Sequence, residues 1–163
     1  MTAYDDLMAF QRETEALGQV AGRLGWDQET TMPRGAGPQR AEEMAAMESV
    51  LHARAIAPQV AEWLEVIDDA SLDAVGRANL RHIRRNHDRT SKVPSALAAR
   101  IARVTSEAQG IWAKARAEDD FSAFAPTLTE VIGLKREEGQ ALAMGGDVYD
   151  AMLADYEPGT TGA

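Results

Sequence analysis

The three histidines, His52, His82 and His87, are the side chains most able to build a metal site in this sequence. A helical zinc site of the peptidase type needs two histidines four residues apart with a glutamate between them. His82 and His87 are five residues apart, about 140° around a helix, and Ile-Arg-Arg-Asn separates them. We therefore expect surface or half-buried histidines and no shared metal site.

Other residue types also fail to complete an active site. Glu48 and His52 share a helix face, but zinc needs three or four ligands, so the spacing predicts a hydrogen-bonded pair. The sequence has no cysteine, which excludes thiolate nucleophiles, disulfides and cysteine-ligated zinc. It also lacks G-x-S-x-G, a phosphate loop and G-x-G-x-x-G. The sequence thus predicts no catalytic residue, no metal ligand and no cofactor in this chain.

A basic stretch is the remaining chemical feature, and it allows two interpretations. It consists of Arg77, Arg81, Arg84, Arg85, Arg89 and Lys92. The functional interpretation is an anion-binding or partner-binding face. The alternative, which we favour, is a solvated helix face paired with acids such as Asp73 and Asp88, because the chain carries a formal net charge of -9. That charge also argues against general nucleic-acid binding.

Helical periodicity runs through almost the whole sequence, and no segment alternates like a strand. It predicts an all-α domain over residues 1–163, with six or seven mostly antiparallel helices. We expect the first helix to end at Gly25, since glycine favours helix C-termini, and an ordered loop over Trp26–Pro38. Ser71 is the expected N-cap of a later helix, and Pro126 is expected to open the last long one.

The clearest helical stripe follows Pro94 and has a coiled-coil-like period. Its apolar members are Leu97, Ile101, Val104, Ala108, Ile111 and Ala115, widened by Trp112. Such a stripe is buried either within the domain or against another chain. It therefore keeps open a second functional class, a free-standing helical interaction or oligomerisation module without enzymatic activity.

Neither a membrane span nor a secretion signal is predicted. No apolar run approaches the roughly 20 residues that a transmembrane helix needs. The first ten residues carry Asp5 and Asp6 and lack a basic region leading into an apolar one. We expect a cytoplasmic protein.

Several ordered blocks together carry a resemblance to a known family. They are Gly25–Pro33 (GWDQETTMP), Arg40–Glu43 (RAEE), Lys92–Pro94, Ser106–Gln109 with Trp112 and Ala115–Ala117, Asp120–Phe121 with Phe124–Pro126, and Tyr149–Gly159 (YDAMLADYEPG). In this order and spacing the chain resembles the N-terminal part of the carboxypeptidase Taq family.

The resemblance implies a longer, largely helical enzyme with a deep groove, which uses zinc or cobalt to release C-terminal residues from peptides. Family members hold the metal with H-E-x-x-H and a later glutamate, and many are homodimers. This sequence contains no H-E-x-x-H. We therefore expect an inactive N-terminal groove-wall domain, whose partners would be the missing C-terminal catalytic region, a second copy in a homodimer and, in the full-length enzyme, peptide substrates.

Within the resemblance, Trp26, Met32 and Arg40 are the candidates for lining the substrate groove. The alternative for Trp26, which we favour, is that its ring plugs the junction between two helices. Metal preference, peptide specificity and oligomeric state do not follow from the sequence.

Overall fold

The computed structural model describes residues 2–162, and within them the chain is helical with no β-strand. The predicted all-α class is confirmed. The α-helices are α1 (Ala3–Thr30), α2 (Gly37–Ala55), α3 (Pro58–Val66), α4 (Ala74–Thr90), α5 (Ser95–Ala117), α6 (Phe121–Ala143) and α7 (Val148–Leu153). Short 3-10 turns, Arg34–Ala36 and Asp69–Ser71, precede α2 and α4.

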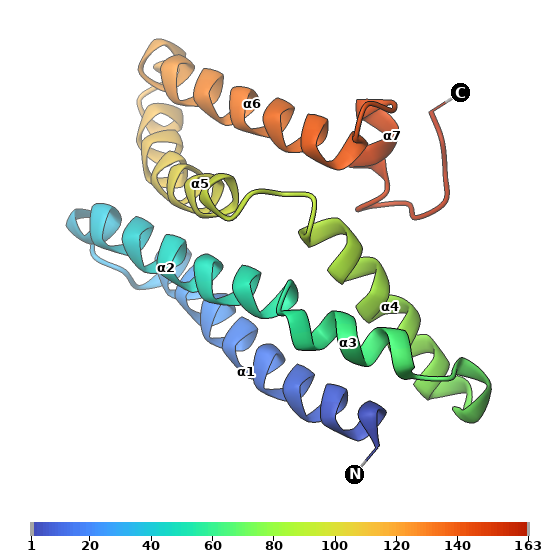
Figure 1. The fold of residues 1–163 in the computed structure, drawn as a ribbon. Helices are drawn as coiled ribbons and strands as arrows, with labels where there is room; N and C mark the ends of the chain where they lie inside the picture. Colours follow the sequence, from blue (N-terminus) through green and yellow to red (C-terminus); the bar gives the residue numbers. More distant parts are fainter. Residues whose placement is uncertain (1, 163) are drawn as a thin grey trace.

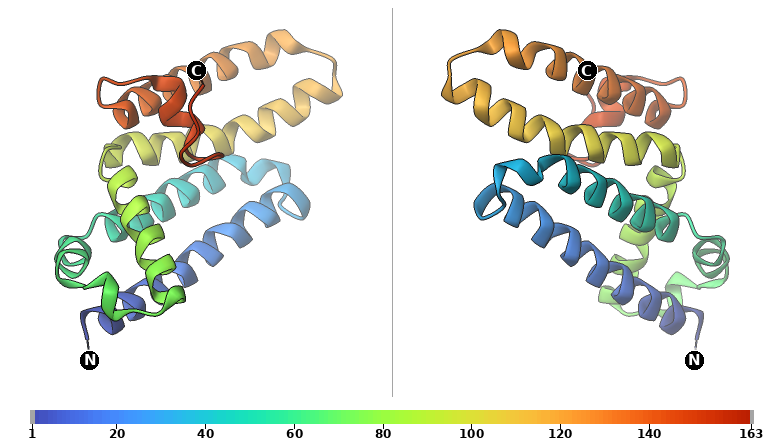
Figure 2. Two further views of the ribbon diagram at one scale, coloured as in Figure 1. Left: turned by 90° about the vertical axis from the view of Figure 1, so that its right-hand side faces the viewer. Right: turned by 90° about the vertical axis from the view of Figure 1, so that its left-hand side faces the viewer.

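The long helices form a stack in the order α1, α2, α5, α6 (Figure 1, Figure 2). Neighbours in the stack are antiparallel. Helix α4 crosses one end of it, from the N-terminal end of α1 to the start of α5, and α7 folds back on the end of α6. Because α1 and α6 form the outer layers, α2 and α5 make the central contact.

Two small apolar cores lie on either side of the centre. One joins α1, α3 and α4 and contains the buried residues Leu7, Val60, Leu64, Ile67 and Leu80. The other joins α5 and α6 through Leu97, Val104 and Leu134. Between them, the α2–α5 contact is lined by the small side chains Ala41, Ala45, Ala98 and Ala108, which let the two helices approach closely.

Local signals explain most helix starts. Thr2 and Asp5 form a reciprocal capping box at the start of α1. Asp73, not Ser71, caps α4 by accepting a hydrogen bond from the Gly76 N–H, because Ser71 already lies in a 3-10 turn. The expected Ser71 cap was therefore wrong.

Two other expected boundaries were also wrong. Helix α6 begins at Phe121, capped by Asp120, and includes Pro126 in its second turn. Early in a helix a proline removes only one backbone hydrogen bond, and the Asp120 cap offsets part of that cost. Helix α1 likewise continues through Gly25 to Thr30, so the expected loop shrinks to the residues between Thr30 and the 3-10 turn at Arg34.

The predicted stripe of α5 is buried only in part. Leu97, Val104, Ala108 and Ala115 are buried as expected. Ile111 and Trp112 are 40% and 50% exposed, which corrects that part of the prediction. The position of the ion pair between Arg103 and Glu42 shows why: in this register, the part of α5 around Ile111 and Trp112 extends past the start of α2.

His52 holds the opposite end of the central contact. Its ring is 3% exposed; Nε2–H donates to the Val93 carbonyl at 2.7 Å, and Nδ1 accepts from the Ser95 hydroxyl at 3.1 Å. His87 adds a second link between α4 and the end of α2, with its Nδ1–H donating to the Ala55 carbonyl at 2.9 Å. These histidines tie α2 to the connection between α4 and α5.

We predict that His52→Ala lowers the free energy of unfolding by about 2–4 kcal/mol, because it leaves a cavity and an unsatisfied buried carbonyl. His82→Ala is the matched control: His82 is exposed, and its loss should change stability by at most about 0.5 kcal/mol. Urea unfolding followed by circular dichroism measures both. Equal effects of the two substitutions would contradict the assignment of His52 as a buried link.

Candidate functional site

A polar junction forms where the end of α1, the start of α2 and the middle of α5 meet. We define it as Asp27, Gln28, Arg40, Glu43 and Ser106. Arg40 is 8% exposed, and its guanidinium donates to Asp27 Oδ2 at 2.6 Å, to Glu43 Oε2 at 3.0 Å and to the Leu24 carbonyl. These bonds fold α1 back on α2 and hold the last turns of α1 in helical form beyond Gly25.

Gln28 and Ser106 extend the junction to α5. The Gln28 amide donates from Nε2 to the Ser106 carbonyl at 2.9 Å, and the Ser106 hydroxyl donates to Gln28 Oε1 at 2.8 Å. This reciprocal pair joins residues 78 positions apart in the sequence. Sequence reasoning did not pair them, although both lie in blocks that carry the family resemblance, and that shared membership was the available signal.

The charge state of the junction follows from these contacts. Hydrogen bonds from the Thr31 hydroxyl and then from Arg40 lower the pKa of Asp27 below its ordinary value. The Asp27 carboxylate in turn raises the pKa of Arg40, against the opposing effect of burial. The junction therefore holds a charged arginine beside an ionised carboxylate.

The three groove candidates lie at or near this junction in different environments. Trp26 is 65% exposed, so it does not plug the helix junction, and that alternative is wrong for the chain as it stands. Met32 is half-buried in the short connection after α1. Arg40 is buried and engaged with its three acceptors.

The Glu48–His52 prediction fails because both nitrogens of His52 are occupied by Val93 and Ser95. Glu48 instead borders a hollow of about 230 Å³ among α2, α4 and α6, opposite Glu138. Burial raises the pKa of Glu48; His52 counteracts that shift, and the charge of Glu138 adds to it.

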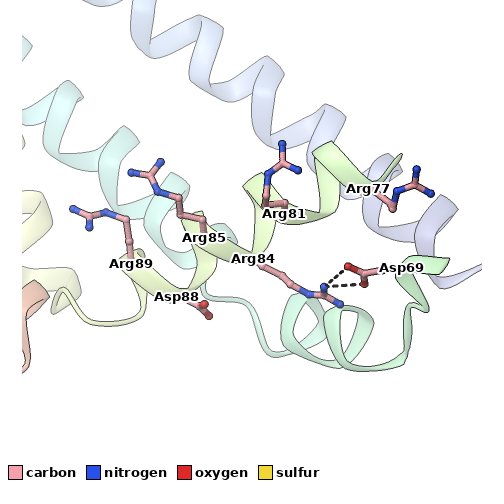
Figure 3. Close-up of a pocket in the computed structure, with 7 residues that line it drawn as sticks. All are labelled: Asp69, Arg77, Arg81, Arg84, Arg85, Asp88 and Arg89. Carbon is pink, nitrogen blue, oxygen red and sulfur yellow. Dashed lines mark hydrogen bonds and ion pairs between the residues drawn. The ribbon is translucent and has the colours of Figure 1, made fainter. Parts of the chain in front are cut away.

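The arginines of the basic stretch have different partners from those expected. Arg84 pairs with Asp69 (Figure 3). Arg89 pairs with Asp155 at 2.7 Å. Asp73 caps α4. Asp88 lines a second hollow, of about 620 Å³, which is also lined by arginines of α4. The pairing with acids that we favoured thus occurs, but through Asp69 and Asp155.

Comparison with known proteins identifies the family to which the chain belongs. The family model described as carboxypeptidase Taq (M32) metallopeptidase matches residues 6–163. The chain belongs to this M32 family. This confirms the resemblance drawn from the ordered blocks.

The curated M32 relatives include thermostable carboxypeptidase 1 of Thermus thermophilus, which is 38% identical over 96% of this chain, and that of Pyrococcus furiosus, 30% identical over 94%. The chain spans about a third of their length, 33% and 31% respectively. Among solved structures, the Trypanosoma cruzi metallocarboxypeptidase 1 matches 98% of the chain at 31% identity with a TM-score of 0.74, covering 32% of that protein. The BsuCP crystal structure has the same fold over 99% of the chain and 33% of its own length, with a TM-score of 0.93 at 20% identity.

M32 metallopeptidases imply a metal, and the histidines of this chain do not fit one. Both ring nitrogens of His52 are engaged in hydrogen bonds. The Nδ1–H of His87 donates to a backbone carbonyl, which leaves the lone pair on its Nε2 available, but one imidazole alone does not make a metal site. Across residues 2–162, no three His, Asp or Glu side chains gather as metal ligands. In the same range, no helix is both long and apolar enough for a transmembrane span.

We predict that Arg40→Ala destabilises the chain by about 2–3 kcal/mol, because it strips a buried guanidinium from two carboxylates and a carbonyl. Since the pKa of Asp27 is lowered in the folded state, the ion pair contributes fully above about pH 5 and loses its contribution as pH falls through the folded pKa. The difference between wild type and variant should therefore shrink in acid. Urea unfolding at several pH values measures it.

The control for this prediction is Arg103→Ala. Arg103 and Glu42 form an exposed ion pair, so the substitution should cost less than about 0.5 kcal/mol. A destabilisation by Arg40→Ala that is as small as this, or that grows as pH falls, would show that the junction is not held by the ion pair.

Proposed function

We propose that this chain is the N-terminal helical part of a metal-dependent carboxypeptidase and that it does not hydrolyse peptides by itself. The observation that carries the proposal is the M32 match over residues 6–163, by a chain that spans about a third of its curated relatives. The relatives named carboxypeptidase or metallocarboxypeptidase support an exopeptidase that acts on peptide C-termini. We further propose that zinc or cobalt is bound by residues other than those of this chain.

The engaged histidines support the second half of this proposal. A metal that activates water needs ligands with free lone pairs around an open coordination position. Both ring nitrogens of His52 are engaged, and His87, whose Nε2 keeps a lone pair, does not gather with two further His, Asp or Glu side chains within residues 2–162. The sequence also contains no H-E-x-x-H. These histidines are therefore suited to connecting the helices of a groove wall and not to binding the catalytic metal.

We propose the polar junction as the frame of that wall, with Trp26 and Met32 as its substrate-facing residues. Arg40 acts here as a positioning residue, because its hydrogen bonds fix the end of α1, on which Trp26 stands. The exposed indole of Trp26 stands on a helix end that the hydrogen bonds of Arg40 fix in place. It is therefore suited to contacting a bound peptide at small entropic cost.

The alternative function, a free-standing oligomerisation module, receives less support. Leu97, Val104, Ala108 and Ala115 of the coiled-coil-like stripe are buried within the single chain, against α2 and α6. They are therefore not available to pair with another helix. We favour the carboxypeptidase part on this ground.

We predict that the purified chain releases no amino acid from blocked dipeptides when zinc or cobalt is added. The full-length Thermus thermophilus relative serves as the positive control in the same assay. Product is measured by reaction of the released amine. Metal-dependent turnover that co-purifies with this 163-residue chain would refute the claim of inactivity.

We predict that Trp26→Ala leaves the stability of this chain within about 0.5 kcal/mol of wild type, since the ring is mostly exposed. Trp63→Ala is the control: Trp63 contacts Phe10 edge-on at 5.7 Å between centroids, and its loss should cost about 3 kcal/mol. In a complete family enzyme with tryptophan at this position, the same change should raise KM for peptides with unchanged melting. An unchanged KM would exclude the groove role.

A further inference from the structure

Helix α4 carries a row of arginines that the proposed function does not use. Arg77, Arg81, Arg85 and Arg89 follow one another at intervals of four residues, so their side chains leave the same side of the helix. Arg84 lies beside this row (Figure 3). Like charges at this spacing repel and destabilise an isolated helix by about 0.2–0.5 kcal/mol per pair, so the row needs anions to offset the repulsion.

Anions within the chain satisfy only part of the row. Arg84 donates to both carboxylate oxygens of Asp69, at 2.8 and 2.9 Å. Arg85 and Arg89 donate to the Ala154 and Ala151 carbonyls at the end of α7, and Arg89 also pairs with Asp155. These contacts neutralise the middle and the C-terminal end of α4.

Arg77 and Arg81 differ from the others. Both are exposed, Arg77 donates to the Leu72 carbonyl, and no carboxylate within residues 2–162 forms an ion pair with either. In Figure 3 their guanidinium groups extend away from the Asp69–Arg84 pair. The N-terminal half of the row therefore presents charge without a counter-charge.

The row lines an open hollow of about 620 Å³ with an excess of positive charge. Five arginines stand against Asp69, Asp88 and Asp155, the last of which pairs with Arg89, so two net positive charges remain in a chain whose formal net charge is -9. The hollow has the size of a small-molecule site, but every residue that lines it is an arginine or an aspartate. Its recognition chemistry is that of guanidinium forks, which match phosphate oxygens in pairs.

We propose that this hollow binds a small oligophosphate, a chain of two or three phosphate groups, through Arg77 and Arg81 with Arg85 completing the contact. Arg77 and Arg81 stand about 6 Å apart along the helix axis, so two linked phosphate groups can each meet one guanidinium, which favours a di- or triphosphate over a single divalent anion. A long nucleic acid is disfavoured, because the acidic remainder of the chain would repel its backbone. This inference is independent of the carboxypeptidase proposal.

Titration calorimetry of the full chain with tripolyphosphate, at fixed ionic strength and neutral pH, tests the proposal. We expect saturable binding at one site, weaker for pyrophosphate and at least about tenfold weaker for sulfate. The double variant Arg77→Gln/Arg81→Gln should weaken tripolyphosphate binding by about tenfold or more. Both residues are exposed, so the fold should persist, and circular dichroism verifies this.

The matched control is Arg100→Gln/Arg103→Gln, which removes two exposed arginines of α5 that pair with Glu130 and Glu42. It removes the same charge and should leave the affinity for tripolyphosphate unchanged. Equal weakening by both double variants, or equal affinity for sulfate and tripolyphosphate, would reduce the effect to net charge and overturn the site. Tighter binding of a duplex of about 20 base pairs than of tripolyphosphate would overturn the assignment to a small ligand.

Discussion

The position of α2 is the constraint on which the rest of the chain depends. Its small side chains, Ala41 and Ala45, pack against α5 with little apolar area to contribute. Because burial contributes roughly 25 cal/mol per Å², these small side chains stabilise the contact weakly and do little to fix the register or the crossing angle of α2 and α5. Directional hydrogen bonds fix its position instead. Arg40 ties the start of α2 to the end of α1, which Gln28 links to Ser106 of α5, and His52 ties the other end of α2 to Val93 and Ser95.

This arrangement also joins the two small apolar cores. The core of α1, α3 and α4 and the core of α5 and α6 share none of their buried members. They contact each other through α2 and through the connection at Val93 and Ser95, which His52 holds. The hydrogen bonds of the buried polar residues thus fix the position of one half of the chain relative to the other.

The sequence was sufficient for whatever depends on local periodicity and on large apolar side chains. Leu97, Val104 and Ala108 are buried as their spacing predicts, and the helical class follows from the same pattern. The boundaries expected at Gly25 and Pro126 were wrong because other interactions override the local preferences of these residues. Arg40 binds the Leu24 carbonyl and keeps α1 helical past Gly25, and the Asp120 cap starts α6 before Pro126. His52 misled because its partners, Val93 and Ser95, lie 41 and 43 residues away, where helical spacing carries no information.

For the candidate site, the family resemblance predicted more than the chemistry of single residues did. It placed Trp26, Met32 and Arg40 in one region, yet it did not show that Gln28 and Ser106 would meet across it. A reciprocal side-chain pair between α1 and α5 cannot be read from either helix, because each residue alone is an ordinary polar side chain. The same blocks that mark the family are therefore, in three dimensions, the contacts that fix the end of α1 against α2 and α5. A structural role in orienting that end is sufficient to explain why polar residues occupy buried positions there, and it leaves the exposed Trp26 as the part of the junction free to meet another molecule.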